Sequence, residues 1–366
     1  MDMKELCVSL GADIINPDRN YWLVRTKGGR FFDDFYFEGY VAIGWNKINI
    51  DRADARDKKE ILDDMKTQVS EFYKEEKMPG RPAGQIYRFI KEMKKGDIVI
   101  VPNADSKYIA FGEIIEDDMY IEDIENEDID IDTIEKEILY NKDETYVTEL
   151  LSEVSCPFSK RRKVRWLKDM DRNKLDSSLY GLLNSHGTIS EANKYAYSID
   201  RELSSFYIKG EKAHLVYNVT TEEDVPAIDL LDFVYKNLEY IDVYNKLFDE
   251  NISKKDVIMK LNVQSPGPID LQGNIAGIAA IATLGVFLVG GTAKYKKDKE
   301  GNVEAEIGSK GFMQQMLDYI DKKNLGEKVE RLEKELEEKK EILKVKEPNV
   351  KLTNPEIAID EDSSNN

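Results

Sequence analysis

Short runs of apolar and aromatic residues, separated by glycine-containing turns, fill the first third of the chain and restrict its fold. Tyr21–Thr26 and Val41–Trp45 have the length and composition of strands, and a Gly-Gly pair and an aromatic-acidic segment lie between them. Asp97–Val101 and Tyr108–Ile115 predict two more strands, joined by a short loop. Strands this short, rich in aromatic residues, predict a small curved β-barrel rather than a helical bundle.

Two helices and a further strand are expected in the same region. Arg56–Glu75 has apolar residues at helical spacing, and Ala83–Met93 repeats that pattern after a Pro-Gly-Arg-Pro break. Lys163–Leu167 predicts another barrel strand, and the first domain boundary is expected near residue 200. Residues 113–144 are strongly acidic, which predicts a solvated hairpin or an insertion loop.

A second set of elements follows residue 200. The strand His214–Val219, the helix Val225–Phe248 and the strand Val257–Val263 predict a small α/β unit. The chain as a whole is therefore expected to be an α+β protein. Its expected parts are a barrel over residues 1–200, the small unit over 201–272, an apolar segment over 273–293, a C-terminal helical region over 294–346 and a disordered tail over 347–366.

The overall charge limits the possible partners. The chain has 366 residues and a formal net charge of −19, so any surface that binds nucleic acid must be local. Its two cysteines, Cys7 and Cys156, are too few for a disulfide framework or a zinc site. The first residues also lack the basic and apolar regions of a secretory signal. These features favour a cytoplasmic location, and the sequence predicts no metal and no cofactor.

Four pieces in a fixed order carry a resemblance to a known family. They are WLVRTKGGRFFDDF with GYVAIGW, then AGQIYRFIKEMKKGDIVIVP, then IAFGEI, and finally RRKVRWL, within residues 20–200. This order resembles the N-terminal module of Mrr-like restriction proteins, which is similar to EVE and PUA-like barrels. The resemblance implies a PUA/EVE-like reader that holds a flipped-out base in an aromatic-lined pocket.

Aromatic and polar residues of the expected barrel are suited to such a pocket. A base taken out of its stack needs flat faces and polar groups for its edges. The aromatic residues suited to supply the faces are Trp22, Tyr36, Phe37, Tyr40 and Trp45. Trp45 is the leading candidate because it follows Gly44 and begins a loop, and glycine lets a backbone approach a planar ligand. For Trp22, which lies in mid-strand, a core position is the alternative. The expected ligand-contacting residues are Trp45, Gly44, Asn46, Arg25, Trp22, Tyr40, Gln85 and Asn103.

A basic stretch interrupts the acidic chain and predicts contacts to phosphate groups. The alternative is a solvated strand edge that pairs with the acidic residues 113–144. The expected phosphate-binding residues are Lys160, Arg161, Arg162, Lys163 and Arg165.

The uncharged run Ile275–Gly291 would span about 26 Å as a helix. A helix that crosses a bilayer needs about 20 apolar residues, so this run is short for a membrane span. It predicts membrane contact or oligomerisation, carried by Ile275, Gly285 and Phe287, and a buried helix is the alternative. The C-terminal helix has apolar residues at heptad-like spacing, which predicts a weak coiled coil or packing on the second domain.

Binding is expected rather than catalysis, because no nuclease, NTPase or hydrolase motif is recognisable. The favoured function is a bacterial sensor of nucleic acid or modified bases in antiphage defence. Its barrel reader would be coupled to a self-associating or membrane-acting C-terminal region. The alternatives are a diverged Mrr-like metal-dependent nuclease and a membrane-associated scaffold that binds protein. Expected partners are a nucleic acid or nucleotide-like ligand, further copies of the chain and a membrane.

Overall fold

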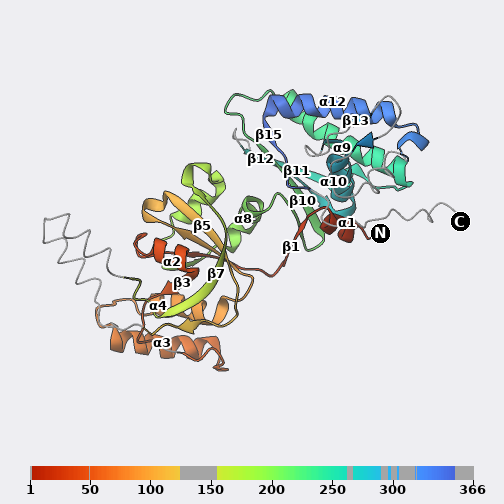
Figure 1. Cartoon of the computed structure of the whole chain (residues 1–366). Helices are drawn as coiled ribbons and strands as arrows, with labels where there is room; N and C mark the ends of the chain where they lie inside the picture. Colours follow the sequence, from red (N-terminus) through yellow and green to blue (C-terminus); the bar gives the residue numbers. More distant parts are fainter. Residues whose placement is uncertain are drawn as a thin grey trace. The chain divides into compact units, whose positions relative to one another are not determined.

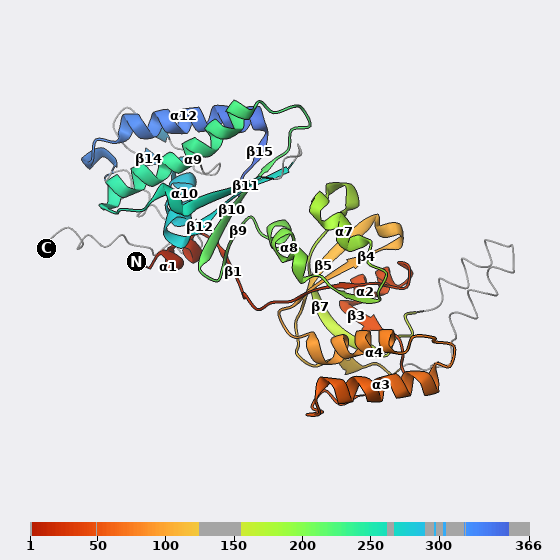
Figure 2. The ribbon, with the colours of Figure 1, turned by 180° about the vertical axis from the view of Figure 1, so that it is seen from behind.

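The computed structural model describes residues 2–48, 50–123, 155–261, 267–289, 296–297, 303–304, 318 and 320–350. The chain divides into two compact units (Figure 1, and from behind in Figure 2). We call Asp18–Leu203 the barrel unit, and we call Met1–Pro17 together with Ser204–Asn366 the C-terminal unit.

The barrel unit is built on one curled half-barrel sheet (Figure 1). Its strands follow the order β3-β7-β5-β4-β2-β8, with the short β6 beside β7. β2 runs parallel to β4, and the other neighbouring strands are antiparallel. The structure thus confirms the α+β class and a curved sheet before residue 200. The strands are β2 (Tyr21–Val24), β3 (Tyr40–Ile43), β4 (Ile98–Pro102), β5 (Tyr108–Ile114), β6 (Tyr120–Ile121), β7 (Lys160–Asp171) and β8 (Ile189–Glu191).

Helices cover both faces of this sheet, which explains the apolar composition of its strands. Trp22 and Val24 of β2 belong to the core on one face, and Tyr21 and Leu23 belong to the core on the other. Because side chains alternate along a strand, all four residues are buried. The first face carries α2 (Phe32–Glu38), α3 (Lys58–Phe72), α4 (Gly80–Tyr87) and the π-helical turn η1 (Arg88–Glu92), and the second carries α7 (Tyr180–Leu183) and α8 (Ala196–Leu203).

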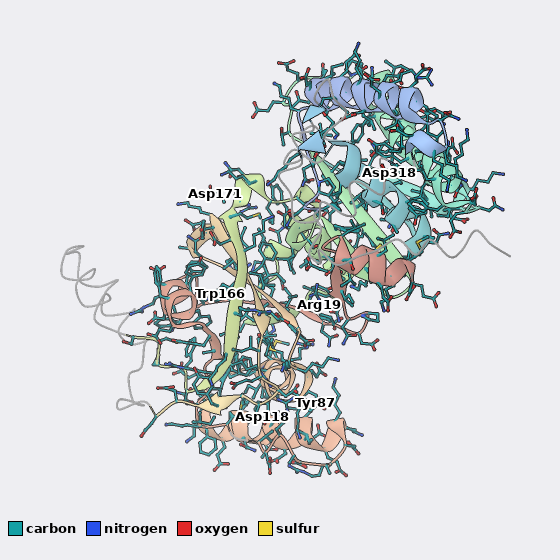
Figure 3. All side chains as sticks on the ribbon, turned by 45° about the vertical axis from the view of Figure 1, so that its right-hand side comes forward. Arg19, Tyr87, Asp118, Trp166, Asp171 and Asp318 are labelled. Atoms are coloured by element: carbon teal, nitrogen blue, oxygen red, sulfur yellow. The ribbon has the colours of Figure 1, made fainter. Side chains whose placement is uncertain are left out.

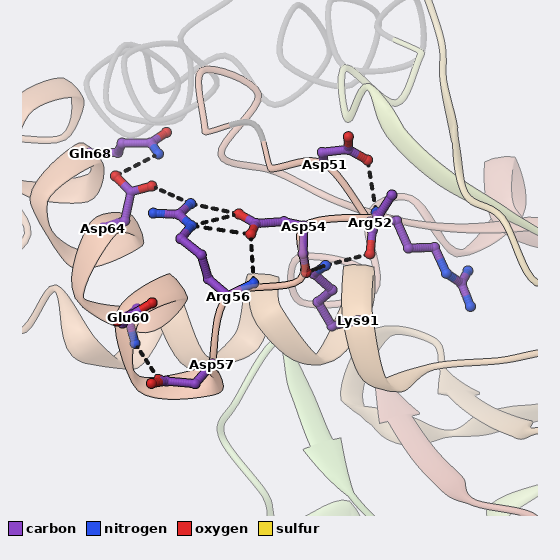
Figure 4. A network of polar contacts seen from close by, with 10 residues as sticks. Asp51, Arg52, Asp54, Arg56, Asp57, Glu60, Asp64, Gln68 and Lys91 are labelled. Atoms are coloured by element: carbon purple, nitrogen blue, oxygen red, sulfur yellow. Dashed lines mark hydrogen bonds and ion pairs between the residues drawn. The ribbon is translucent and has the colours of Figure 1, made fainter.

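A polar network fixes the start of α3 (Figure 4). Asp57 caps the helix, because its carboxylate accepts hydrogen bonds from two backbone N–H groups of the first turn at 2.8 and 2.9 Å. Arg56 bridges Asp54 at 2.6 Å and Asp64 at 3.0 Å. Lys91 Nζ donates to the backbone carbonyl of Asp54 at 2.8 Å, which ties η1 to the loop before α3.

The C-terminal unit is a sheet with its helices packed on one face (Figure 2). The strand order is β1-β9-β10-β12-β11, β15 also pairs with β10, and β13 pairs with β14 separately. β1 is parallel to β9, whereas the other pairs are antiparallel. The elements are α1 (Met3–Ser9), β1 (Asp13–Ile15), β9 (Phe206–Lys209), β10 (Lys212–Val219), α9 (Ala227–Phe248), β11 (Val257–Leu261), β12 (Gly267–Asn274), α10 (Ile275–Val289), β13 (Lys296–Lys297), β14 (Val303–Glu304), α12 (Gly326–Leu343) and β15 (Val345–Lys346). Short 3-10 turns are η2 (Ala104–Ser106), η3 (Arg172–Lys174), η4 (Ser177–Leu179), η5 (Asn193–Tyr195) and η6 (Lys254–Asp256).

The N-terminal residues belong to the C-terminal unit, which corrects the expected barrel domain over residues 1–200. Leu6 and Cys7 of α1 are buried in the core of the C-terminal unit. β1 pairs with β9, whose residues lie far away in the sequence. A parallel pair between such distant segments leaves no local sequence signal, so the expected boundary is wrong for residues 2–17.

α10 is an interior helix of the C-terminal unit. Ile278, Ile281 and Leu284 are fully buried, and they pack in the core with α1, α9 and the sheet. Ile275 is half-buried, Gly285 borders a cavity of about 40 Å³, and the side chain of Phe287 lies outside the described residues. No helix in the described part of the chain is long and apolar enough to cross a bilayer. The buried-helix alternative therefore describes α10, and a membrane or oligomer role for it has no support in this packing.

The apolar side of α12 also packs inside the C-terminal unit. Val329, Leu332 and Leu336 are buried in the same core as α9. Packing on the second domain therefore replaces the expected coiled coil. Most of the expected acidic loop, at residues 124–144, and most of the expected tail, at residues 351–366, lie outside the described residues.

Candidate functional site

Trp22 is a core residue rather than a pocket residue, which corrects its expected role as a ligand contact. Its side chain is only 3% exposed, and Nε1 donates to Asp97 Oδ2 at 2.9 Å. Asp97 is fully buried and also accepts a hydrogen bond from the backbone N–H of Asn20 at 3.0 Å. A buried indole N–H requires such a partner, so the Trp22–Asp97 pair stabilises the sheet.

Arg25, Tyr40 and Gln85 also have structural partners in place of the expected ligand. Arg25 Nε donates to the carbonyl of Ser185 at 2.8 Å, and burial lowers the pKa of its guanidinium. Tyr40 is 2% exposed, and its ring lies under the guanidinium of Arg161 at 4.2 Å. Gln85 is buried, and its side-chain oxygen accepts from the backbone N–H of Ile189 at 2.9 Å. These side chains fasten loops and helices to the sheet.

Trp45 is half-exposed, unlike Trp22 and Tyr40, the other two aromatic residues among the expected ligand contacts. Its backbone is left-handed, with φ of 57°, a conformation that costs about 1–3 kcal/mol outside glycine and that the surrounding structure must hold. Lys160 Nζ holds it by donating to the carbonyls of Trp45 and Asn46 at 2.9 and 3.0 Å. Exposure and strain together keep Trp45 as a candidate ligand contact.

The other three expected pocket residues shape their own loops. A Cβ on Gly44 would lie 3.3 Å from the ring of Phe158. The Phe158 ring therefore already occupies the space beside Gly44 that a planar ligand would need. Asn46 Nδ2 donates to the carbonyl of Pro157 at 2.8 Å. Asn103 Oδ1 accepts from the backbone N–H of Tyr108 at 2.8 Å and closes the β4–β5 loop.

The basic stretch divides between the inside and the outside of β7. Lys160 and Arg162 are fully buried, and Arg161 is 8% exposed. Arg162 donates to the backbone carbonyls of Phe89 at 2.7 Å, Asp117 at 2.8 Å and Ile90 at 3.1 Å. Burial and these hydrogen bonds keep the guanidinium inside the protein and out of reach of a phosphate. The expected phosphate-binding role of Lys160, Arg161 and Arg162 is therefore corrected to a structural one.

The exposed cations of β7 are paired with acids. Lys163 Nζ lies 3.0 Å from Glu116, and Arg165 lies 2.5 Å from Glu113. Both acids belong to the acidic region 113–144. These two pairs agree with the alternative prediction, in which the basic stretch is a solvated strand edge that pairs with that region. These pairs are exposed and therefore weak, so they limit phosphate binding without preventing it.

A group of aromatic side chains lies partly exposed where α2 meets β5 and β7, and we call it the aromatic surface. It consists of Tyr36, Phe37, Tyr108 and Trp166, and Figure 3 labels Trp166 on β7. The Tyr36 ring is stacked between Trp166, at 5.5 Å, and the buried Phe32, at 5.7 Å. Phe37 packs edge-on against Tyr36 at 5.6 Å and is 80% exposed. The stack is therefore anchored in the core at one end and open to solvent at the other.

Asp169 fixes the tyrosines of the aromatic surface. Tyr36 donates its hydroxyl proton to Asp169 Oδ1 at 2.8 Å, and Tyr108 donates to Asp169 Oδ2. The hydrogen bond to Asp169 is the main reason that the pKa of the Tyr36 phenol is raised. Because both hydroxyls are held, the rings are ordered before any ligand arrives, which lowers the entropic cost of binding.

A bulge in β7 brings Trp166 onto this surface. Gly112 of β5 faces Trp166 and Phe111 faces Lys168, so Leu167 is an extra residue in the ladder. A Cβ on Gly112 would lie 2.8 Å from the Trp166 ring and 2.3 Å from Val164 Cγ1. Only glycine at this position lets the indole lie across the neighbouring strand.

We expect Gly112→Ala to displace the Trp166 ring. The added methyl group overpacks the site and should lower the free energy of unfolding by about 1–3 kcal/mol. Tryptophan emission and denaturant unfolding of the full chain measure both effects. Gly84→Ala is the matched control, because a Cβ there meets no atom within 4 Å. Unchanged emission and stability in Gly112→Ala would contradict this account of the bulge.

The sequence analysis names Tyr36 and Phe37 as possible stacking faces but not Tyr108 and Trp166, although the sequence contains two signals for the aromatic surface. One is the aromatic run Phe35-Tyr36-Phe37, which is longer than a helix of seven residues can bury on one side. The other is a glycine inside the strand Tyr108–Ile114, which often marks a bulge or a close approach. Neither signal shows which strand supplies the stacking partner.

Comparison with known proteins matches most of the barrel unit to a family model that carries no function. Residues 21–189 match the family model described as Domain of unknown function (DUF8426). The match runs from the start of β2 to the start of β8, so it contains the whole aromatic surface. No curated protein and no solved structure matches the chain.

Proposed function

We propose that the barrel unit is a recognition module that stacks an unpaired or modified base of a nucleic acid on the aromatic surface. The observation that carries this proposal is the ordered stack of Phe32, Tyr36 and Trp166, next to the exposed ring of Phe37. Stacking a base on an aromatic side chain contributes about 1–3 kcal/mol and tolerates any base. The curled half-barrel sheet is compatible with the PUA/EVE-like reader that the sequence resembles.

The charges around the surface favour stacking over phosphate contact. α2 carries Asp33, Asp34 and Glu38, and Arg165, which precedes Trp166 in β7, is paired with Glu113. A surface with these acidic groups attracts a phosphate backbone only weakly. The affinity of the aromatic surface for a nucleic acid should therefore depend weakly on salt concentration. We propose that such a reader serves antiphage defence and acts through the C-terminal unit.

We expect Phe37→Ala to weaken binding of a single-stranded oligonucleotide by about 5- to 150-fold, the equivalent of one lost stacking contact. Titration of the full chain with single-stranded, duplex and base-modified oligonucleotides measures this effect. Phe37 is 80% exposed, so its removal should leave stability nearly unchanged. Phe72→Ala is the matched control, because Phe72 is 47% exposed on α3, away from the stack.

Two results would count against this function. One is equal affinity of Phe37→Ala, Trp166→Ala and the unaltered chain for every oligonucleotide. The other is metal-dependent cleavage of the oligonucleotides, which would favour the alternative of a diverged nuclease. Within the described ranges, no group of three or more His, Cys, Asp and Glu side chains is placed to hold a metal ion.

A further inference from the structure

We infer that the barrel unit has a second binding site, a cleft that takes a phosphate group of a nucleotide-sized ligand. The cleft has a volume of about 520 Å³, which lies within the usual range for small-molecule sites. α4 and the first residue of η1 form one wall, and the segment that leads into β8 forms the other. Figure 3 labels Tyr87, the last residue of α4. This site is separate from the aromatic surface, and the inference does not depend on base stacking.

Unpaired basic side chains line the cleft. Arg81, Arg88 and His186 all border it, and none of these side chains has a hydrogen-bond or ion-pair partner among the described residues. Every other arginine of the barrel unit has an ion pair, a hydrogen bond or an aromatic ring as its partner. These partnered arginines are Arg19, Arg25, Arg30, Arg52, Arg56, Arg161, Arg162, Arg165, Arg172 and Arg201.

Two free guanidinium groups in one cleft are notable because the chain has a net charge of −19. Acidic side chains are abundant, yet none pairs with Arg81 or Arg88 in the described structure. Guanidinium groups bind phosphate oxygens through paired N–H groups, which gives both energy and direction. The cleft is therefore suited to an anionic ligand.

The backbone adds to this character. Gly80 and Gly84 lie in the first two turns of α4 and border the cleft, and a Cβ on Gly84 would point into open space. In the first turn of α4, the backbone N–H groups of Arg81 and Ala83 donate to the carbonyls of Met78 and Pro79, and Pro82 has no N–H. Among the described residues this leaves the N–H of Gly80 to meet an anion at the start of the helix. Arg88 begins the π-helical turn η1, a distortion often found at functional sites.

The two walls are held together without a ligand. The side-chain oxygen of Gln85 accepts a hydrogen bond from the backbone N–H of Ile189, across the cleft, at 2.9 Å. One acid, Glu191, also borders the cleft, and its carboxylate accepts from Asn193 Nδ2 at 3.0 Å. With two arginines against one carboxylate, the cleft keeps a positive charge.

The test uses three probes on the full chain: inorganic phosphate, adenosine monophosphate and a single-stranded oligothymidine. We expect Arg81→Gln/Arg88→Gln to weaken adenosine monophosphate binding at least tenfold, measured by titration calorimetry. Gly84→Leu should have a similar effect, because its side chain would fill the cleft without a change of charge. Lys107→Gln/Lys174→Gln is the control for net charge, because both lysines are exposed and lie outside the cleft.

The probes also separate the two sources of the phosphate. If the cleft takes nucleic-acid phosphates, the double arginine variant should lower the slope of log affinity against log salt for oligothymidine by about 1.4. If it takes a small phosphorylated molecule, only the adenosine monophosphate and phosphate affinities should fall. Equal affinities of the double arginine variant and the unaltered chain for all three probes would overturn the inference, as would no binding of any probe to the unaltered chain. Phe37→Ala, which tests the aromatic surface, should leave phosphate binding unchanged.

Discussion

Replacing Arg162 with methionine is expected to lower the free energy of unfolding of the barrel unit by about 3–5 kcal/mol. The side chain is fully buried and donates to the backbone carbonyls of Phe89, Ile90 and Asp117. Two of these carbonyls, those of Phe89 and Ile90, lie in η1. Carbonyl groups at the end of a helix have no partner within the helix, so the guanidinium supplies the hydrogen bonds that they lack. Each buried carbonyl left without a donor costs about 1–3 kcal/mol, and methionine replaces only the apolar stem.

Arg165→Met on the same strand is the matched control. Arg165 is exposed and pairs only with Glu113, so its loss should change stability by about 0.5 kcal/mol or less. Denaturant unfolding followed by tryptophan fluorescence measures both variants. The chain has three tryptophans, Trp22, Trp45 and Trp166, and all lie within residues 18–203, so the signal reports on the barrel unit alone. Equal unfolding midpoints for the two variants would show that Arg162 is not the structural residue described here.

The contrast between these two arginines shows where sequence reasoning ends. Lys163–Leu167 is recognisable as a strand, and β7 contains it but begins three residues earlier, at Lys160. Its charges suggest a surface that meets phosphate, yet the carbonyls that satisfy Arg162 come from residues more than forty positions away. A buried cation and an exposed cation have the same local sequence pattern. Only the tertiary contacts decide between them.

The strands β2, β3, β4 and β5 of the barrel unit were predictable for the opposite reason, because their signals are local. Val41–Ile43 and Ile98–Val101 are apolar runs that end at glycine or proline, and the structure places a strand at each. The aromatic surface combines local and distant information. The aromatic run of α2 is visible in the sequence, whereas its stacking on Trp166 depends on a bulge at Leu167. The glycine in β5 hints at a bulge but does not show that the bulge lies in β7.

α10 is the second place where composition alone misleads. An uncharged run rich in alanine and glycine fits a membrane segment, an oligomer interface or a core helix equally well. In the structure, β10 and β12 form the sheet beneath it, and α9 and α1 pack beside it in one core. Small side chains such as Ala279 and Ala280 are fully buried there, which lets the helix approach its neighbours closely.

Ile281→Asp is therefore expected to unfold the C-terminal unit, at a cost of more than about 4 kcal/mol. Ile281 is fully buried in the core, so the change removes apolar contacts and buries a carboxylate that has no partner. Hydrogen exchange of the full chain measures this effect, because amides of β10 and β12 should lose their protection. Tryptophan emission of the barrel unit serves as an internal reference in the same sample.

Gly285→Ala on the same helix is expected to have the opposite sign. A Cβ on Gly285 meets no atom within 4 Å, and alanine favours a helix over glycine by up to about 1 kcal/mol. If α10 acted by entering lipid, Ile281→Asp would abolish flotation with anionic vesicles while protection in β10 and β12 stayed intact. Lost protection in Ile281→Asp, together with equal or greater protection in Gly285→Ala, would instead show that α10 is packed in the core. The two variants thus distinguish a helix that stabilises the C-terminal unit from a segment that leaves this unit to enter lipid.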